Sequence, residues 1–239
     1  MSSPEALPVI ADASASAPTE SKRFRAKKGL ALRILITIIA LAVWFWTQSL
    51  LGARGSQTAP IGDALHRLTA GLNTFFQSAP HAANILLIVS SALIDATAIF
   101  LLGSWIFAGK IRPFLGLAIL LVTRQVMQAL CSLPPPSGII WHYPGFPSLL
   151  VTYGVANDFF FSGHTAIAVF GATELARFRK PWLTAAAIGA VVFEIAAVLV
   201  LRAHYTMDVF AGILAAWWVA HICEGISERT SPVPAERAG

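Results

Sequence analysis

Six long apolar runs alternate with short polar connections along the chain. A helix that crosses the roughly 30 Å hydrocarbon core of a bilayer needs about 20 mainly apolar residues, and each run, bounded by charges, Pro or Gly, approaches this length. We predict six membrane-spanning helices at residues 30–52, 83–109, 114–133, 161–176, 182–201 and 205–226. The fold class is therefore predicted to be an all-α, polytopic membrane protein.

The same pattern divides the chain into one membrane domain and two tails. The first 21 residues are rich in Ala, Ser and Pro, a composition typical of disorder. We predict a disordered cytoplasmic tail over residues 1–28, a six-helix membrane domain with the candidate catalytic residues over 29–226, and a short cytoplasmic tail over 227–239. Because the first apolar run begins near residue 30 and is long enough to span, we expect a permanent helix rather than a cleaved signal peptide.

Composition and charge support this topology. Hydrophobic residues make up 56% of the 239 residues and charged residues only 12%, which excludes an ordinary soluble domain. Lys and Arg gather before the first run, at 110–112 and at 177–180, so these connections and both termini are expected on the cytoplasmic side. The net charge of +5 thus reflects membrane orientation, and no nucleic-acid partner is predicted.

Two histidines are predicted near the outer ends of the fourth and sixth spans. His164 opens the fourth span within the sequence SGHT, and His204 precedes the sixth within HYTMDV. Asp208 follows His204 by four residues, so on a helix its carboxylate can accept one imidazole proton and fix the tautomer. The other nitrogen is then free to attack phosphorus, and His164 can protonate the leaving oxygen in a two-step covalent mechanism.

The residues around the histidines suit a phosphate group. Ser162 and Gly163 would lie at a helix N-terminus, where unpaired N–H groups favour an anion and glycine lets the backbone approach closely. Arg202 can neutralise a further oxygen. A single His at a span end is more often an interfacial residue, and an i,i+4 His/Asp pair is often only a local hydrogen bond. Their combination on one membrane face favours a phosphoryl-transfer site.

The two motifs resemble the sphingomyelin synthase-like branch of the type-2 phosphatidic acid phosphatase superfamily, six-span enzymes that move lipid phosphate groups at the outer membrane face. Residues 156–165 keep the Asp (Asp158) and the last five positions of the first motif of that branch, without its Cys and Gly. Residues 204–209 match its second motif completely. The resemblance implies His204 as nucleophile, Asp208 as its orienter and His164 as the acid on the leaving group.

The resemblance also implies supporting residues and substrates. Arg124, ahead of a Leu-Pro-Pro-Pro turn, corresponds to an Arg of the branch and is a further phosphate-binding candidate. Asp158 and Tyr205, within the two motifs, are candidate supporting residues. A phospho-headgroup of phosphatidylcholine or phosphatidylethanolamine would pass to ceramide or diacylglycerol through a phosphohistidine-type intermediate. With water as acceptor, the same site gives a phospholipase C or, on a monoester such as phosphatidate or polyprenyl phosphate, a phosphatase.

Three buried charges complete the sequence picture. Asp95 and Arg124 are central in the second and third spans and are expected to pair, because unpaired ions are costly in lipid. Glu194 lies below the outer end of the fifth span and is a candidate supporting residue for the His pair. An aromatic outer loop at 141–147 is expected to anchor at the headgroup level or to cover the site. A small transporter with a polar path through these charges is the non-enzymatic alternative.

No cofactor or metal is required by this mechanism, and the expected partners are membrane lipids. The sequence predicts no particular oligomeric state. The lack of a long glycosylated loop or a retention tail leads us to expect a bacterial inner membrane with the site facing the periplasm.

Overall fold

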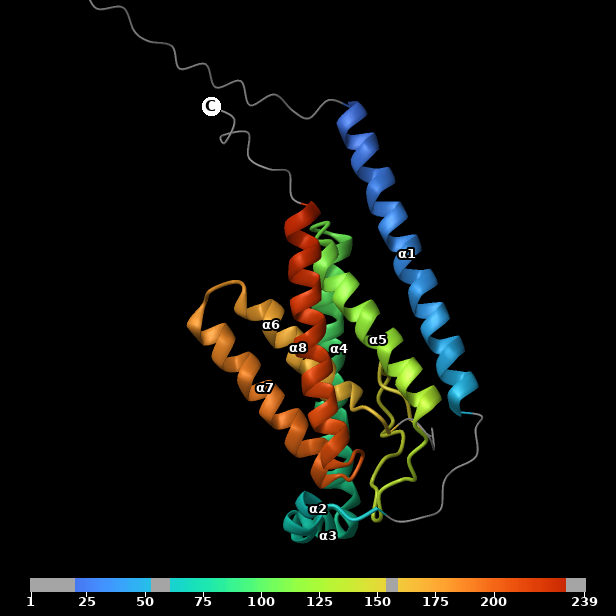
Figure 1. The fold of residues 1–239 in the computed structure, drawn as a ribbon, viewed down its shortest axis with the longest axis vertical. Helices are drawn as coiled ribbons and strands as arrows, with labels where there is room; N and C mark the ends of the chain where they lie inside the picture. The colour runs from blue at the N-terminus through green and yellow to red at the C-terminus, as the bar shows by residue number, and fades with distance from the viewer. Residues whose placement is uncertain (1–19, 53–60, 154–158, 231–239) are drawn as a thin grey trace, which may run out of the picture.

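The computed structural model describes residues 20–52, 61–153 and 159–230, and all regular elements in these ranges are helices, which confirms the all-α prediction there. The helices are α1 (Glu20–Gly52), α2 (Ala64–Leu68), α3 (Ala70–Ser78), α4 (Pro80–Ile106), α5 (Ile111–Leu130), α6 (Gly163–Ala176), α7 (Pro181–Val200) and α8 (Thr206–Thr230). Figure 1 shows α4, α5 and α8 at the centre, with α1 beside α5 and the α6–α7 pair on the other side.

Within the described ranges, five helices are long and apolar enough to cross a membrane. These segments are Lys27–Leu50, Pro80–Ile106, Ile111–Leu130, Pro181–Val200 and Thr206–Ile226. The fourth predicted span folds as α6, whose 14 residues extend about 21 Å at 1.5 Å per residue, less than the hydrocarbon thickness. The protein is therefore a multi-pass helical membrane protein with five candidate spans, and a sixth crossing through α6 stays a prediction.

Proline sets several helix boundaries and explains why they differ from the predicted ones. α4 and α7 begin at Pro80 and Pro181, since the first turn of a helix tolerates a residue without an N–H group. α5 ends at Leu130, four residues before the first of three consecutive prolines. At the termini, α1 begins at Glu20, inside the predicted tail of residues 1–28. The rest of that tail and residues 231–239 lie outside the described residues.

The two ends of the bundle differ in charge. The basic connections between α4 and α5 and between α6 and α7 lie at the end where α1 begins and α8 ends (Figure 1). The short helices α2 and α3 and the α5–α6 connection lie at the opposite end. The two connections richest in Lys and Arg among the described residues thus share one end, and the direction of that end in a membrane stays a prediction.

Asp63 joins two helix N-termini at the second end. Its Oδ1 accepts the backbone N–H of His66 at 3.1 Å and caps α2. The same carboxylate accepts the Thr206 N–H at 2.6 Å and the Thr206 hydroxyl at 2.7 Å, at the start of α8. Burial acts to raise the pKa of Asp63, but the hydrogen bonds from Thr206 and His66 outweigh it and hold the pKa below its usual value. One carboxylate therefore caps both helices.

Replacing Asp63 by alanine is expected to lower the free energy of unfolding by about 1–2 kcal/mol at neutral pH, the usual cost of losing a helix cap. Because the folded pKa is depressed, this contribution is complete above the unfolded pKa of about 3.9 and is lost as pH falls through the folded pKa. Thermal unfolding of both proteins in detergent across pH 3 to 7 measures the difference. Thr74→Ala, which removes an exposed hydroxyl bonded only within its own helix, is the matched control. A difference that persists unchanged at pH 3 would contradict the assignment.

Candidate active site

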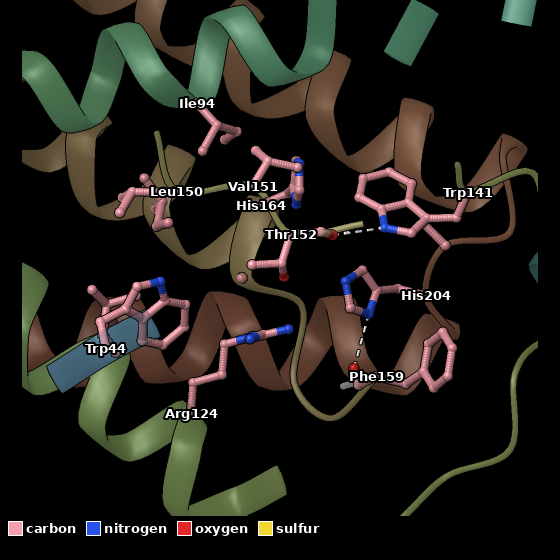
Figure 2. A pocket seen from close by; sticks show the side chains of 14 residues that line it. Trp44, Ile94, Arg124, Trp141, Leu150, Val151, Thr152, Phe159, His164 and His204 are labelled. Atoms are coloured by element: carbon pink, nitrogen blue, oxygen red, sulfur yellow. Dashed lines mark hydrogen bonds between the residues drawn. The ribbon is translucent and has the colours of Figure 1, made fainter. Parts of the chain in front are cut away.

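Both motif histidines line one small cavity. The cavity has a volume of about 40 Å³ and lies between α1, α4, α5, the start of α6 and the residues that precede α8 (Figure 2). Its polar wall consists of Arg124, Gly163, His164 and His204, together with Thr152. Apolar side chains supply the rest: Trp44, Ile94, Leu121, Trp141, Leu150, Val151, Phe159, Ile167 and Ala203. The structure thus brings together four of the predicted site residues from segments far apart in the sequence.

The first motif forms the N-terminus of α6. Ser162 is the N-cap, its Oγ accepts the Thr165 N–H at 3.3 Å, and its backbone N–H donates to the Asp208 carbonyl at 3.1 Å. Gly163 follows as the first helical residue. A Cβ at Gly163 would lie 3.0 Å from Arg124 Nε, so glycine permits the close approach of the arginine. The N-terminus of α6, with the positive end of its dipole, therefore lies at the cavity beside a guanidinium, an arrangement that favours an anion.

His204 is held by a backbone carbonyl. Its Nδ1 lies 2.8 Å from the carbonyl oxygen of Phe159, as the dashed line in Figure 2 marks. A carbonyl oxygen only accepts, so Nδ1 carries the proton and Nε2 of the neutral ring keeps its lone pair. The ring is 7% exposed, on the cavity wall. Tautomer and orientation therefore suit a nucleophile.

Asp208 lies beside His204 without a direct hydrogen bond to it. Oδ2 is 3.8 Å from His204 Nδ1, within ion-pair range but beyond hydrogen-bond length. The same oxygen accepts the backbone N–H of Tyr205 at 2.8 Å. The fully buried carboxylate thus shapes the first turn of α8 and supplies a negative charge next to the ring. The direct orienting contact belongs to Phe159, which the sequence motifs do not reveal because a backbone oxygen has no residue signature.

His164 lies against Trp141 from the α5–α6 connection. The two rings meet edge to face with centroids 5.2 Å apart. His164 Nε2 is buried and has no hydrogen-bond partner within the part of the chain that the structure describes. An ionisable group that lines a cavity without a fixed partner is available for proton transfer to a bound substrate.

Arg124 brings positive charge to the cavity from α5. Its Nε donates to the Phe161 carbonyl at 3.0 Å, which fixes the side chain against the turn before α6. Figure 2 shows the guanidinium directed toward His204. The predicted Asp95–Arg124 pair is not formed: Asp95 accepts the backbone N–H groups of Leu149 and Leu150 at 2.7 and 3.1 Å. Asp95 therefore fixes the α5–α6 connection, since its position on α4 faces that loop.

Three other candidates lie outside the cavity wall. Arg202 adopts a positive φ of 54° and donates to the carbonyls of Ser137 and His66 at 2.7 and 3.2 Å. The Tyr205 hydroxyl donates to the Pro134 carbonyl at 3.1 Å. Glu194 accepts the Ser90 hydroxyl at 2.7 Å. These contacts give Arg202 and Tyr205 a role in holding the α5–α6 connection and α2 in place, and Glu194 a role in joining α4 to α7. The candidate Asp158 lies outside the described residues.

Comparison with known proteins gives the family. The family model described as AtPDCT1/2 matches residues 62–225, most of the chain and both histidine motifs. The chain belongs to the AtPDCT1/2 family. Among curated proteins, this AtPDCT1/2 member is 24% identical over 152 residues to phosphatidylcholine:diacylglycerol cholinephosphotransferase 1 of Arabidopsis thaliana. The match covers 61% of this chain and 47% of the relative, so the chain spans about half of that protein's length. No solved structure matches.

The family agrees with the lipid phosphotransferase part of the resemblance derived from the motifs. The narrower assignment to the sphingomyelin synthase-like branch stays a prediction, as does a sphingolipid substrate.

Proposed function

We propose that this protein transfers phosphocholine from phosphatidylcholine to the hydroxyl of a diacylglycerol, through a covalent intermediate on His204. The observation that carries the proposal is the hydrogen bond of His204 Nδ1 to the Phe159 carbonyl, which leaves Nε2 as the free nitrogen in a cavity that also contains His164 and Arg124. The curated relative, named a cholinephosphotransferase for this lipid pair, supports the choice of substrates.

The first half-reaction forms a P–N bond. His204 Nε2 attacks the phosphorus of phosphatidylcholine, the bond from phosphorus to the glycerol oxygen breaks, and that oxygen takes a proton from His164. Arg124 and the N–H groups at the start of α6 stabilise the negative oxygens of the phosphoryl group as charge shifts among them. Asp208, 3.8 Å from Nδ1, stabilises the positive charge that the imidazole gains.

The second half-reaction reverses these steps on a new acceptor. The hydroxyl of the incoming diacylglycerol gives its proton to His164, its oxygen attacks phosphorus, and the P–N bond to His204 breaks. His164 is thereby protonated again for the next cycle. Two histidines and an arginine suffice for the charge and proton balance, so we propose no cofactor.

The proposed site lies at the end of the bundle opposite the basic connections (Figure 1). The positive-inside rule therefore assigns it to the outer face of the membrane. The bacterial inner membrane, with the site toward the periplasm, remains our prediction, and the named relative comes from a plant.

The test is a product assay with purified protein in EDTA. Phosphatidylcholine is mixed with isotope-labelled diacylglycerol, and parallel reactions contain phosphatidylethanolamine or labelled ceramide. We expect labelled phosphatidylcholine as the main product. Labelled sphingomyelin would make ceramide the acceptor, and release of free phosphocholine without labelled lipid would indicate a phospholipase C. If the only product is phosphate released from phosphatidate, the protein is a phosphatase. If no assay gives a product, the transport alternative is favoured.

A further inference from the structure

An apolar groove runs between α1 and α5 and ends at the active-site cavity. The groove encloses about 340 Å³ and is lined mainly by aliphatic and aromatic side chains of these two helices. Trp44 of α1 and Leu121 of α5 line both the groove and the cavity of the two histidines. Figure 2 shows Trp44 beside Arg124 at this junction. The α1/α5 groove is therefore continuous with the proposed chemistry.

The polarity of the α1/α5 groove changes along its length. Gln125 Nε2 donates to Gln48 Oε1 at 2.8 Å, one turn beyond Trp44 and Leu121 toward the outer end. In the other direction the groove reaches Thr37 and Phe114, seven residues and about 10 Å away along each helix. A lipid with its polar part at the cavity would thus lay a hydrocarbon chain toward the bilayer centre, the direction it has in an outer leaflet.

Trp44 has a polar atom at the junction. The residue is 6% exposed, and its Nε1–H has no hydrogen-bond partner in the described part of the chain. Buried indole N–H groups usually find an acceptor, because an unpaired one costs free energy. An ester carbonyl at the head of an acyl chain is an acceptor of suitable chemistry.

The size of the α1/α5 groove limits which molecules it can enclose. One turn of an α-helix, about 10 Å wide and 5.4 Å long, fills roughly 420 Å³, more than the whole groove. The groove therefore cannot enclose a helix of a second copy or of another protein, whereas it admits the first part of a single hydrocarbon chain.

We propose that the α1/α5 groove binds one acyl chain of the lipid substrate while its headgroup reacts at His204, and that Trp44 Nε1–H donates to the ester carbonyl of that chain. This inference rests on the proposed function, because it takes the lipid's reacting end to be in the histidine cavity. It identifies the α1/α5 groove as the place where an acyl chain of that substrate binds, and Trp44 as the residue that recognises the ester.

Filling the α1/α5 groove with a larger side chain tests whether it binds an acyl chain. Ala40→Phe places a ring on the groove wall, about 6 Å below Trp44 along α1. We expect kcat/KM for dioleoyl lipids to fall about tenfold or more and that for dibutyryl lipids to change less than about twofold, because a four-carbon chain does not reach residue 40. Val192→Phe, at a 61% exposed position of α7, is the matched control and should alter neither. Equal losses on long and short chains would overturn the proposal.

Removing the Trp44 Nε1–H group tests the proposed hydrogen bond to the ester carbonyl. For Trp44→Phe we expect KM for ester lipids to rise roughly threefold to tenfold, the effect of one hydrogen bond. The KM for the corresponding ether lipids, which lack the carbonyl, should stay within about twofold. An equal rise for ester and ether lipids would overturn the assignment of Trp44.

Photocrosslinking separates this inference from the proposed function. A phosphatidylcholine with a diazirine in mid-chain should label residues 37–44 and 114–122 in the wild type and in His204→Ala, and should label them much less in Ala40→Phe. Such labelling in a wild type without any transferase activity would support the groove and refute the proposed function. Transferase activity without labelling of these segments would refute the groove and leave the proposed function intact.

Discussion

His204→Ala is expected to lower kcat for phosphocholine transfer by about 10³-fold or more, because it removes the atom that forms the P–N bond. The same change also breaks the hydrogen bond to the Phe159 carbonyl. This loss should cost only about 1 kcal/mol in the free energy of unfolding. Activity is measured by the labelled diacylglycerol assay and folding by the thermal midpoint in detergent.

Two further variants separate chemistry from structure at this position. His204→Asn keeps an N–H donor at the position of Nδ1 but has no atom in place of Nε2, so we expect it to fold like the wild type and to be as inactive as His204→Ala. His81→Ala, at an exposed position near the start of α4, should be fully active. If His204→Asn retained more than about a tenth of the wild-type rate, His204 would not be the nucleophile.

His164→Ala is expected to lower the rate of transfer from phosphatidylcholine by about 10² to 10⁴-fold, the usual effect of losing a general acid. The diacylglycerol oxygen is a poor leaving group unless it is protonated. A nitrophenolate ion leaves without a proton, so the first-turnover release of p-nitrophenol from p-nitrophenylphosphocholine, which precedes the second half-reaction, should fall less than about tenfold in the same variant. The comparison of the two substrates identifies the proton donor more sharply than either loss alone.

A loss of the same size on both substrates would contradict this role and would indicate that His164 positions the substrate or stabilises the fold. The conservative variant His164→Gln provides the control for packing, because it keeps a polar side chain of similar size against Trp141. We expect its thermal midpoint to match the wild type and its activity on phosphatidylcholine to match that of His164→Ala.

Much of the fold follows from local patterns. The apolar runs are long, and proline marks their ends, so five spans are found within a few residues of the predicted limits. The fourth run was harder to predict because only its length decides between a span and a shorter helix. Its N-terminus is fixed by the Ser162 cap, and 14 residues remain before the basic turn at its other end.

The histidine pair was predictable because both motifs stand at the starts of predicted helices on one predicted face. The contacts that hold these residues were not. The Phe159 carbonyl and the turn at Arg202, with its positive φ, depend on backbone geometry that residue types do not encode. Asp95 likewise binds backbone amides, which residue types do not reveal. The charged side chain of Arg124 was therefore predicted as its partner instead. Trp44 joins the cavity from the first helix, far from either motif, and only the packing of α1 on α5 reveals it.

The small volume of the histidine cavity has a consequence for the fate of the proposed covalent intermediate. About 40 Å³ holds about three or four water molecules, on the scale at which one needs roughly 10–15 Å³. Hydrolysis would require one of them to take the in-line position that a lipid hydroxyl otherwise occupies. The apolar side chains that make up most of the cavity wall offer such a water few hydrogen-bond partners, so in the proposed transferase we expect little loss of headgroups to water, and the relative amounts of two lipid alcohols would then determine the direction of net exchange between lipid pools.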